Sequence, residues 1–197
     1  MRKTLIAIAS LACLLWLPSL GRAQAIPAGM GPGVPNQVGF EITYARPDFW
    51  VMPIGDPQYA RQYILGVSGY GEYRPLRSRY LGVEGEFRCI CLITSLDRAE
   101  LSYLAGPIYS YPIRGRYTLY GKALLGFRDL FIQEEQDNHG IPSGTGLAYA
   151  AGVGLDYQYK PKWNLRLLEV EVQKWPSYST NGINPVVIST GFAYRFQ

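Results

Sequence analysis

The chain has 197 residues, a length that suits one domain with a full core. Its 19 Lys and Arg exceed its 15 Asp and Glu, but three of the basic residues lie in the first 25 positions, where there is no acid. The remainder is close to neutral. This balance excludes the strongly basic composition typical of nucleic-acid-binding proteins, and we predict no nucleic-acid partner.

Residues 1–25 have the pattern of a cleaved signal peptide. Arg2 and Lys3 precede an apolar run from Leu5 to Leu17, and Ala23-Gln24-Ala25 forms a site for a signal peptidase. The run is shorter than the ~20 residues that a membrane-spanning helix needs. We therefore predict an exported chain that is cut after Ala25.

Residues 26–37 are rich in glycine and proline, which predicts a flexible segment. Eight stretches of alternating apolar and polar residues follow in the region 38–197. Each has about the length of a tilted membrane strand, roughly 9–11 residues with short extensions. The predicted strands are Val38–Arg46, Tyr63–Arg74, Arg79–Cys91, Ala99–Ser110, Arg116–Arg128, Leu147–Tyr159, Asn164–Trp175 and Pro185–Phe196.

The connections between these stretches alternate in length. The first, third, fifth and seventh are longer than the connections beside them, which is typical of outer-membrane barrels with long external loops and tight periplasmic turns. A soluble β-sandwich has no reason to keep this order. The predicted connections are residues 47–62, 75–78, 92–98, 111–115, 129–146, 160–163 and 176–184.

One face of each stretch is apolar and rich in aromatic residues at its ends. Aromatic rings favour the depth at which a membrane meets water, because a polar edge can reach the headgroups. A soluble sandwich with one wet face would also alternate, but it would not need aromatic belts. The predicted belts contain Phe40, Tyr44, Tyr63, Tyr73, Tyr109, Tyr117, Phe127, Tyr149, Tyr157, Tyr194 and Phe196, with Trp50, Trp163 and Trp175 at strand ends.

The opposite face carries charges, which we place inside the barrel. An eight-stranded barrel is just wide enough to be filled by side chains, so buried charges must pair with one another. We expect Lys122, Arg128 and Arg195 to bridge carboxylates of neighbouring strands, and a narrow path for water or ions is the alternative. The predicted lumenal network contains Glu41, Glu72, Glu84, Glu86, Lys122, Arg128, Asp156, Glu169, Glu171 and Arg195.

The seventh stretch fits this pattern less well. Its alternation places Glu169 and Glu171 inward, which puts Arg166 outward near the periplasmic interface. There its long side chain could reach the headgroups. The same phase puts Trp175 inward unless a bulge intervenes.

The cysteines do not suggest a redox or metal site. Cys13 lies in the leader, and lipidation there would require an aliphatic residue where Ser10 stands. Cys89 and Cys91 point to the same face of a strand, a spacing that is poor for an unstrained disulfide. We interpret them as small apolar residues on the lipid-facing side.

These features resemble the small OmpA/OmpX-type outer-membrane β-barrels over nearly the whole mature chain. The resemblance implies an all-β, eight-stranded, up-and-down barrel in the outer membrane, surrounded by lipids and lipopolysaccharide. It also implies that the barrel assembly machinery recognises the closing strand Ile188–Phe196, although Gln197 follows the final aromatic residue. No cofactor and no bound metal are implied.

We expect a structural or surface-interaction role in which loops 47–62 and 129–146 face the outside. A narrow pore is the second hypothesis. The third is a lipid-modifying enzyme, for which His139 and Ser143 in the long loop are the candidate catalytic pair. A Gly- and Pro-containing loop holds catalytic geometry poorly, so we predict that the protein is not an enzyme and has no catalytic residue.

Overall fold

The computed structural model describes residues 34–46, 64–75, 80–93, 98–132, 144–178 and 184–196. These ranges do not include the predicted signal peptide, the segment 26–33, Trp50, Tyr63 or the loop residues His139 and Ser143. Predictions that concern them stay predictions. No helix among the described residues is long and apolar enough to cross a membrane.

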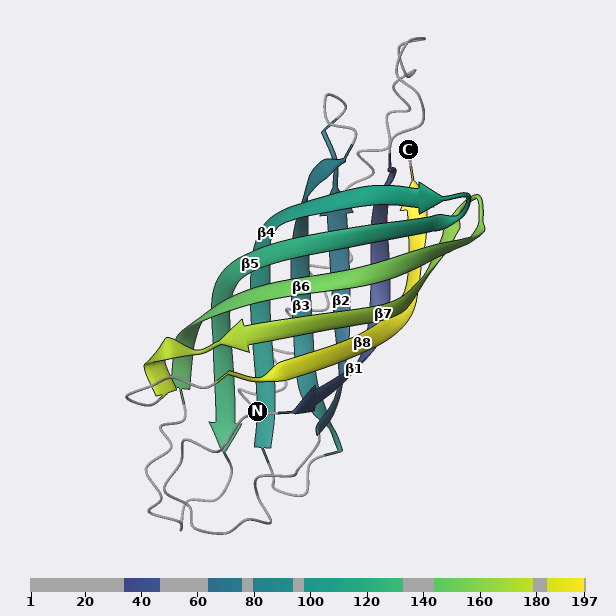
Figure 1. The fold of residues 1–197 in the computed structure, drawn as a ribbon. Helices are drawn as coiled ribbons and strands as arrows, with labels where there is room; N and C mark the ends of the chain where they lie inside the picture. The colour runs from purple at the N-terminus through teal and green to yellow at the C-terminus, as the bar shows by residue number, and fades with distance from the viewer. Residues whose placement is uncertain are drawn as a thin grey trace. The chain divides into compact units, whose positions relative to one another are not determined.

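Eight antiparallel strands form a closed barrel in which each strand pairs with its neighbours in sequence, and β8 pairs with β1 (Figure 1). The predicted fold class is thereby confirmed. Closure leaves no sheet edge, so the backbone groups of every strand find partners within the barrel, as a membrane-spanning sheet requires. The strands are β1 (Asn36–Arg46), β2 (Ile64–Tyr73), β3 (Leu81–Ile93), β4 (Arg98–Arg114), β5 (Tyr117–Ile132), β6 (Gly144–Lys160), β7 (Trp163–Lys174) and β8 (Val186–Phe196), with a short 3-10 turn, η3 (Pro176–Tyr178), after β7.

Several strand ends differ from the prediction. β1 begins at Asn36, so the last part of the segment expected to be flexible is already in the barrel, where the Gln37 side chain is buried. The expected turn 111–115 is mostly strand, because β4 runs to Arg114 and the reversal needs only Gly115 and Arg116. Gly115 has a φ of 59°, a conformation that glycine adopts without strain.

The fifth predicted connection, 129–146, is also shorter than expected at both ends. β5 continues to Ile132 and β6 starts at Gly144. The Asp129 carboxylate accepts a hydrogen bond from the Thr145 hydroxyl across this pair. We call this end of the barrel the loop end, and the end with the Gly115–Arg116 and Pro161–Lys162 reversals the turn end.

Strand β7 corrects the prediction for Arg166. Leu167 and Leu168 are both exposed, and the pairing with β8 shifts between Arg166 and Glu169. This irregularity changes which residues face the lumen, so Arg166 points inward and is buried rather than lying at the lipid interface. Trp175 is buried as well, as the phase of Glu169 and Glu171 predicts, and does not belong to an aromatic belt.

The outward face is apolar along its whole circumference. Large exposed hydrophobic residues occur on all eight strands, from Val38 on β1 to Phe196 on β8. Several rings pack in pairs across neighbouring strands, including Phe87 with Tyr103 and Tyr117 with Tyr157, each with centroids 5.1 Å apart. Of the predicted belt residues, the structure describes these on the outward face: Phe40, Tyr44, Tyr73, Tyr109, Tyr117, Phe127, Tyr149, Tyr157, Tyr194 and Phe196.

Candidate functional site

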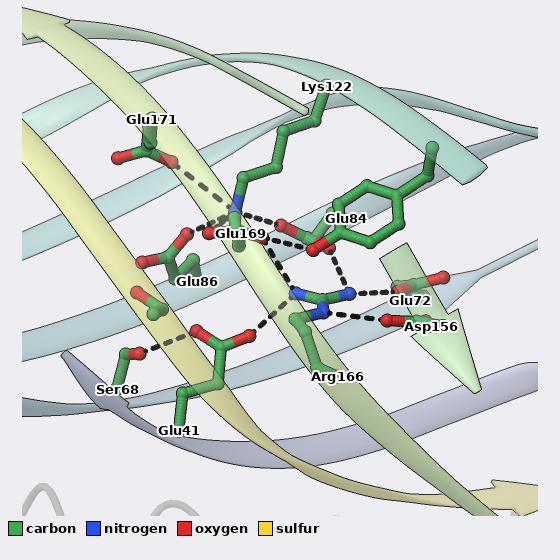
Figure 2. Close-up of polar contacts among 12 residues, drawn as sticks. Glu41, Ser68, Glu72, Glu84, Glu86, Lys122, Asp156, Arg166, Glu169 and Glu171 are labelled. Carbon is green, nitrogen blue, oxygen red and sulfur yellow. Dashed lines mark hydrogen bonds and ion pairs between the residues drawn. The ribbon is translucent and has the colours of Figure 1, made fainter. Parts of the chain in front are cut away.

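The lumen holds a network of buried charges centred on two cations, Lys122 of β5 and Arg166 of β7 (Figure 2). Both side chains are fully buried. The Lys122 ammonium contacts carboxylates from β3 and β7. Its four ion-pair partners are Glu84 (2.8 Å), Glu86 (2.8 Å), Glu169 (2.9 Å) and Glu171 (3.3 Å).

The Arg166 guanidinium contacts carboxylates from five strands. A planar guanidinium with donors on several edges suits such a site better than an ammonium does. Its ion-pair partners are Glu41 (2.7 Å), Glu72 (2.8 Å), Glu169 (3.0 Å), Asp156 (3.2 Å) and Glu84 (3.5 Å). Since Glu84 and Glu169 contact both cations, the two centres form one connected network.

This arrangement explains how carboxylates can lie side by side. Glu72 of β2 and Glu84 of β3 are direct cross-strand partners, a placement that is destabilising for like charges. Arg166 Nη2 contacts both of them, at 2.8 Å and 3.5 Å. The cation therefore offsets a repulsion that the strand register imposes.

Two tyrosine rings enclose the Arg166 guanidinium. The carbon at its centre lies 3.8 Å from the centroid of Tyr70 and 4.4 Å from that of Tyr120. The Tyr120 hydroxyl also donates to Glu169 (2.6 Å). Each ring lies against an inward-facing glycine on the adjacent strand, Gly39 for Tyr70 and Gly154 for Tyr120.

Toward the loop end the network continues through Arg88. Arg88 pairs with Glu171 (2.8 Å) and with Glu86. Gln173 donates to Glu171 (2.7 Å) and accepts from the Trp175 indole (2.9 Å). Arg128 packs on the Trp175 ring, 3.7 Å from its centroid, so a buried indole and a guanidinium lie together toward the loop end.

Toward the turn end, amides and a further arginine complete the network. Gln37 donates to Glu72 (2.5 Å) and to Asp156 (3.2 Å), and it accepts from Asn164 (2.8 Å). Arg74 pairs with Glu72 (2.5 Å). The ordered contacts therefore extend along the lumen from Trp175 to Arg74.

The structure places all ten predicted lumenal residues on the inner face. Nine are buried, and Arg195 is half-buried near the turn end. Lys122 pairs with carboxylates as expected, but these lie on β3 and β7, each one strand beyond its direct neighbours β4 and β6. Arg88 and Arg166 also bridge strands, although the prediction did not include them. The alternation in β3 places Arg88 inward, so the sequence could have predicted its position. The irregularity in β7 makes the same alternation place Arg166 outward, so its position could not be predicted.

Cys89 corrects another prediction, because it is disulfide-bonded. It lies on the outward face, half-buried, where the pairing of β2 with β3 shifts between Leu65 and Val67. The side chain of Cys91 lies outside the described residues.

The ion pairs of the network engage the carboxylates that could otherwise act in catalysis or bind a metal. Glu84 and Glu86, two carboxylates on the inner face of β3, both contact the Lys122 ammonium. The carboxylates of Glu86, Glu169 and Glu171 lie close enough together to hold a metal ion, but Lys122 contacts all three. Lys122 thus provides the positive charge that a bound cation would otherwise supply.

Solved structures share this fold. Neisserial surface protein A superposes with a TM-score of 0.60 at 16% sequence identity, over 82% of this chain and 97% of the other. The outer membrane protein OprG from Pseudomonas aeruginosa gives 0.59 at 15% identity, over 85% and 98%. The outer membrane protein AlkL, solved in DMPC bilayers, gives 0.50 at 15% identity, over 88% and 96%.

No protein-family model matches the chain, and no curated protein matches its sequence. The likeness is thus one of fold, carried by closed topology rather than by shared residues. It confirms the architecture that the resemblance to OmpA/OmpX-type barrels implied: this protein has the closed eight-stranded barrel fold of these small outer-membrane proteins.

Proposed function

We propose that this protein is an integral component of the bacterial outer membrane, in which a sealed barrel anchors external loops that interact with molecules outside the cell. The observation that carries the proposal is the contrast between the two faces of the barrel. Large apolar side chains are exposed all around the outside, while Lys122, Arg166 and their carboxylates are buried within. A face this apolar is compatible with lipid and not with water.

The filled lumen favours an anchor over a pore. A water-filled path would leave charged side chains accessible to solvent, but those of Arg88, Lys122 and Arg166 are fully buried and paired. An interior of this width is filled by side chains. We therefore assign the contacts with outside molecules to the connections at the loop end, within 47–62 and 129–146. Binding residues often lie on loops that a rigid scaffold positions.

Labelling of intact cells tests the placement of the loops. Ser143→Cys in the long loop and Lys162→Cys at the turn end would be treated with a membrane-impermeant maleimide, with the unsubstituted protein as background. We expect labelling of S143C only, and labelling of K162C only would overturn the proposed orientation. Recovery of the processed chain in the soluble periplasmic fraction would overturn membrane insertion.

Planar-bilayer recordings test the seal. The refolded wild-type barrel should give no stepwise current, because the ion pairs around Lys122 and Arg166 block the lumen. Reproducible steps from the wild type would instead support the narrow-pore hypothesis. The enzyme hypothesis depends on His139, which lies outside the described residues. If an H139A strain has the same lipid A acyl chains as the wild type, that hypothesis is wrong.

A further inference from the structure

Charges are segregated by sign between the inside and the outside of the barrel. Among the described acidic residues, all are buried except Asp129, which is half-buried. The exposed charged side chains in the same ranges are all basic: Arg46, Arg116, Lys160, Lys162 and Lys174. Arg116, Lys160 and Lys162 lie together at the turn end, so the described part of that end presents exposed positive charge without exposed negative charge.

These three residues lie on adjacent elements. The Gln158 amide of β6 donates to the Arg116 carbonyl (2.8 Å), which places the β4–β5 reversal beside the end of β6. Lys160 and Lys162 flank Pro161 in the β6–β7 reversal. The Arg195 amide donates to the Lys162 carbonyl (2.9 Å), so this reversal also adjoins β8.

Outward aromatic rings lie directly beside this basic group. Tyr117 packs on Tyr157 with centroids 5.1 Å apart, and Trp163 packs edge-on against Tyr194 at 5.4 Å. The Lys160 ammonium lies 5.3 Å from the centroid of Tyr159, a ring on the outward face. The lysine side chain therefore turns toward the lipid-facing side rather than into the lumen.

We propose that Arg116, Lys160 and Lys162, together called the turn rim, bind the phosphate groups of anionic phospholipids. Aromatic rings of this kind favour the membrane interface, so the adjacent ammonium and guanidinium groups lie at headgroup depth. There they donate charge-assisted hydrogen bonds to phosphate oxygens. The inference rests on the proposed membrane placement and adds to it a lipid class and a site.

The selectivity follows from net charge. A phosphatidylcholine headgroup carries a phosphate together with a cation, which the basic rim repels, whereas phosphatidylglycerol carries the phosphate alone. Each Lys or Arg near an anionic surface contributes up to about fivefold in binding, which corresponds to ~1 kcal/mol. Three such residues should therefore enrich phosphatidylglycerol severalfold beside the barrel.

Spin-labelled lipids measure this preference directly. The barrel would be refolded into phosphatidylcholine vesicles, and electron spin resonance would give the relative association of labelled phosphatidylglycerol and labelled phosphatidylcholine. We expect a severalfold preference for phosphatidylglycerol in the wild type, and a clearly smaller preference in K160Q/K162Q, in which Arg116 alone of the turn rim remains. High salt should reduce the wild-type preference, since the interaction is ionic.

The matched control is R46Q/K174Q, which removes two exposed positive charges from the loop end. It should keep the preference, because the turn rim is intact. Equal association of both lipids with a folded wild-type barrel, or equal loss in the two double variants, would overturn the proposal. Heat-modifiable gel mobility reports insertion separately, so a wild-type chain that never inserts refutes the membrane placement itself.

Discussion

The ring of Tyr120 occupies the space above Gly154, its direct cross-strand partner on β6. A Cβ atom added to Gly154 would lie 2.2 Å from the Tyr120 hydroxyl oxygen. Tyr70 and Gly39, direct partners on β2 and β1, repeat the arrangement, with a Cβ 2.4 Å from the ring. Both glycines thus create the room in which two tyrosines enclose Arg166.

Gly154→Ala should therefore destabilise the barrel. The ring cannot move away without disturbing its stacking on Arg166 and its hydrogen bond to Glu169. Overpacking of this kind costs about 1–3 kcal/mol. Urea unfolding of the refolded protein in detergent, followed by tryptophan fluorescence, measures the change.

Gly85→Ala is the matched control, because a Cβ there meets no atom within 4 Å on the outward face. Replacing glycine in a strand at such a site should leave stability unchanged or raise it by up to about 1 kcal/mol. A G154A variant as stable as G85A would show that Tyr120 does not depend on the space above Gly154.

Arg166→Met should be among the most damaging single changes in the lumen. It leaves Glu41 and Asp156 without the cation that contacts them and leaves Glu72 with Arg74 alone, and removing one partner of a buried ion pair costs about 3–5 kcal/mol. Urea midpoints compared with those of R46M, an exposed arginine, test this. R46M should change stability by no more than about 0.5 kcal/mol, and an equally small effect of R166M would contradict the central role of Arg166.

The inward position of Arg166 could not be predicted from the sequence, whereas most of the strand pattern could. Strand number, strand phase and the inward position of residues such as Glu41, Glu84 and Lys122 follow from a period of two, which a regular strand must keep. That period fails where the register shifts. Leu167 and Leu168 are both apolar and adjacent, so the pattern alone does not say which strand position is irregular.

The alternating pattern also does not predict which residues each lumenal charge contacts. The strand phase places Arg128 in the lumen, but it does not predict that the guanidinium packs on the Trp175 ring. The pairing depends on how eight strands are staggered around the barrel, and this stagger is a property of the closed sheet. Cys89 illustrates the same limit, because its disulfide occurs where the register of β3 shifts.

Lys122 and Glu86 should show a measurable coupling energy. Their ion pair spans 2.8 Å between buried side chains, and K122M alone leaves four carboxylates around an apolar group. A double-mutant cycle with K122M and E86Q should give a coupling of about 0.5–3 kcal/mol, with the double variant more stable than the sum of single effects predicts. A control cycle that pairs E86Q with K174M, an exposed lysine on β7, should be additive within about 0.5 kcal/mol.

Trp163 and Trp175 should respond in opposite ways to a quencher placed in the lipid. Trp163 is 41% exposed on the outward face, whereas Trp175 is 2% exposed and covered by Arg128 within the lumen. Variants that keep only one of these tryptophans, with phenylalanine at the others, would be refolded into vesicles of brominated phosphatidylcholine. Bromine on acyl chains quenches an indole only when the two are close, so Trp163 fluorescence should fall strongly and Trp175 fluorescence should stay near its value in unbrominated lipid. Equal quenching of both would place Trp175 on the lipid-facing side and would contradict the strand phase on which the inward position of Glu169 and Glu171 also depends.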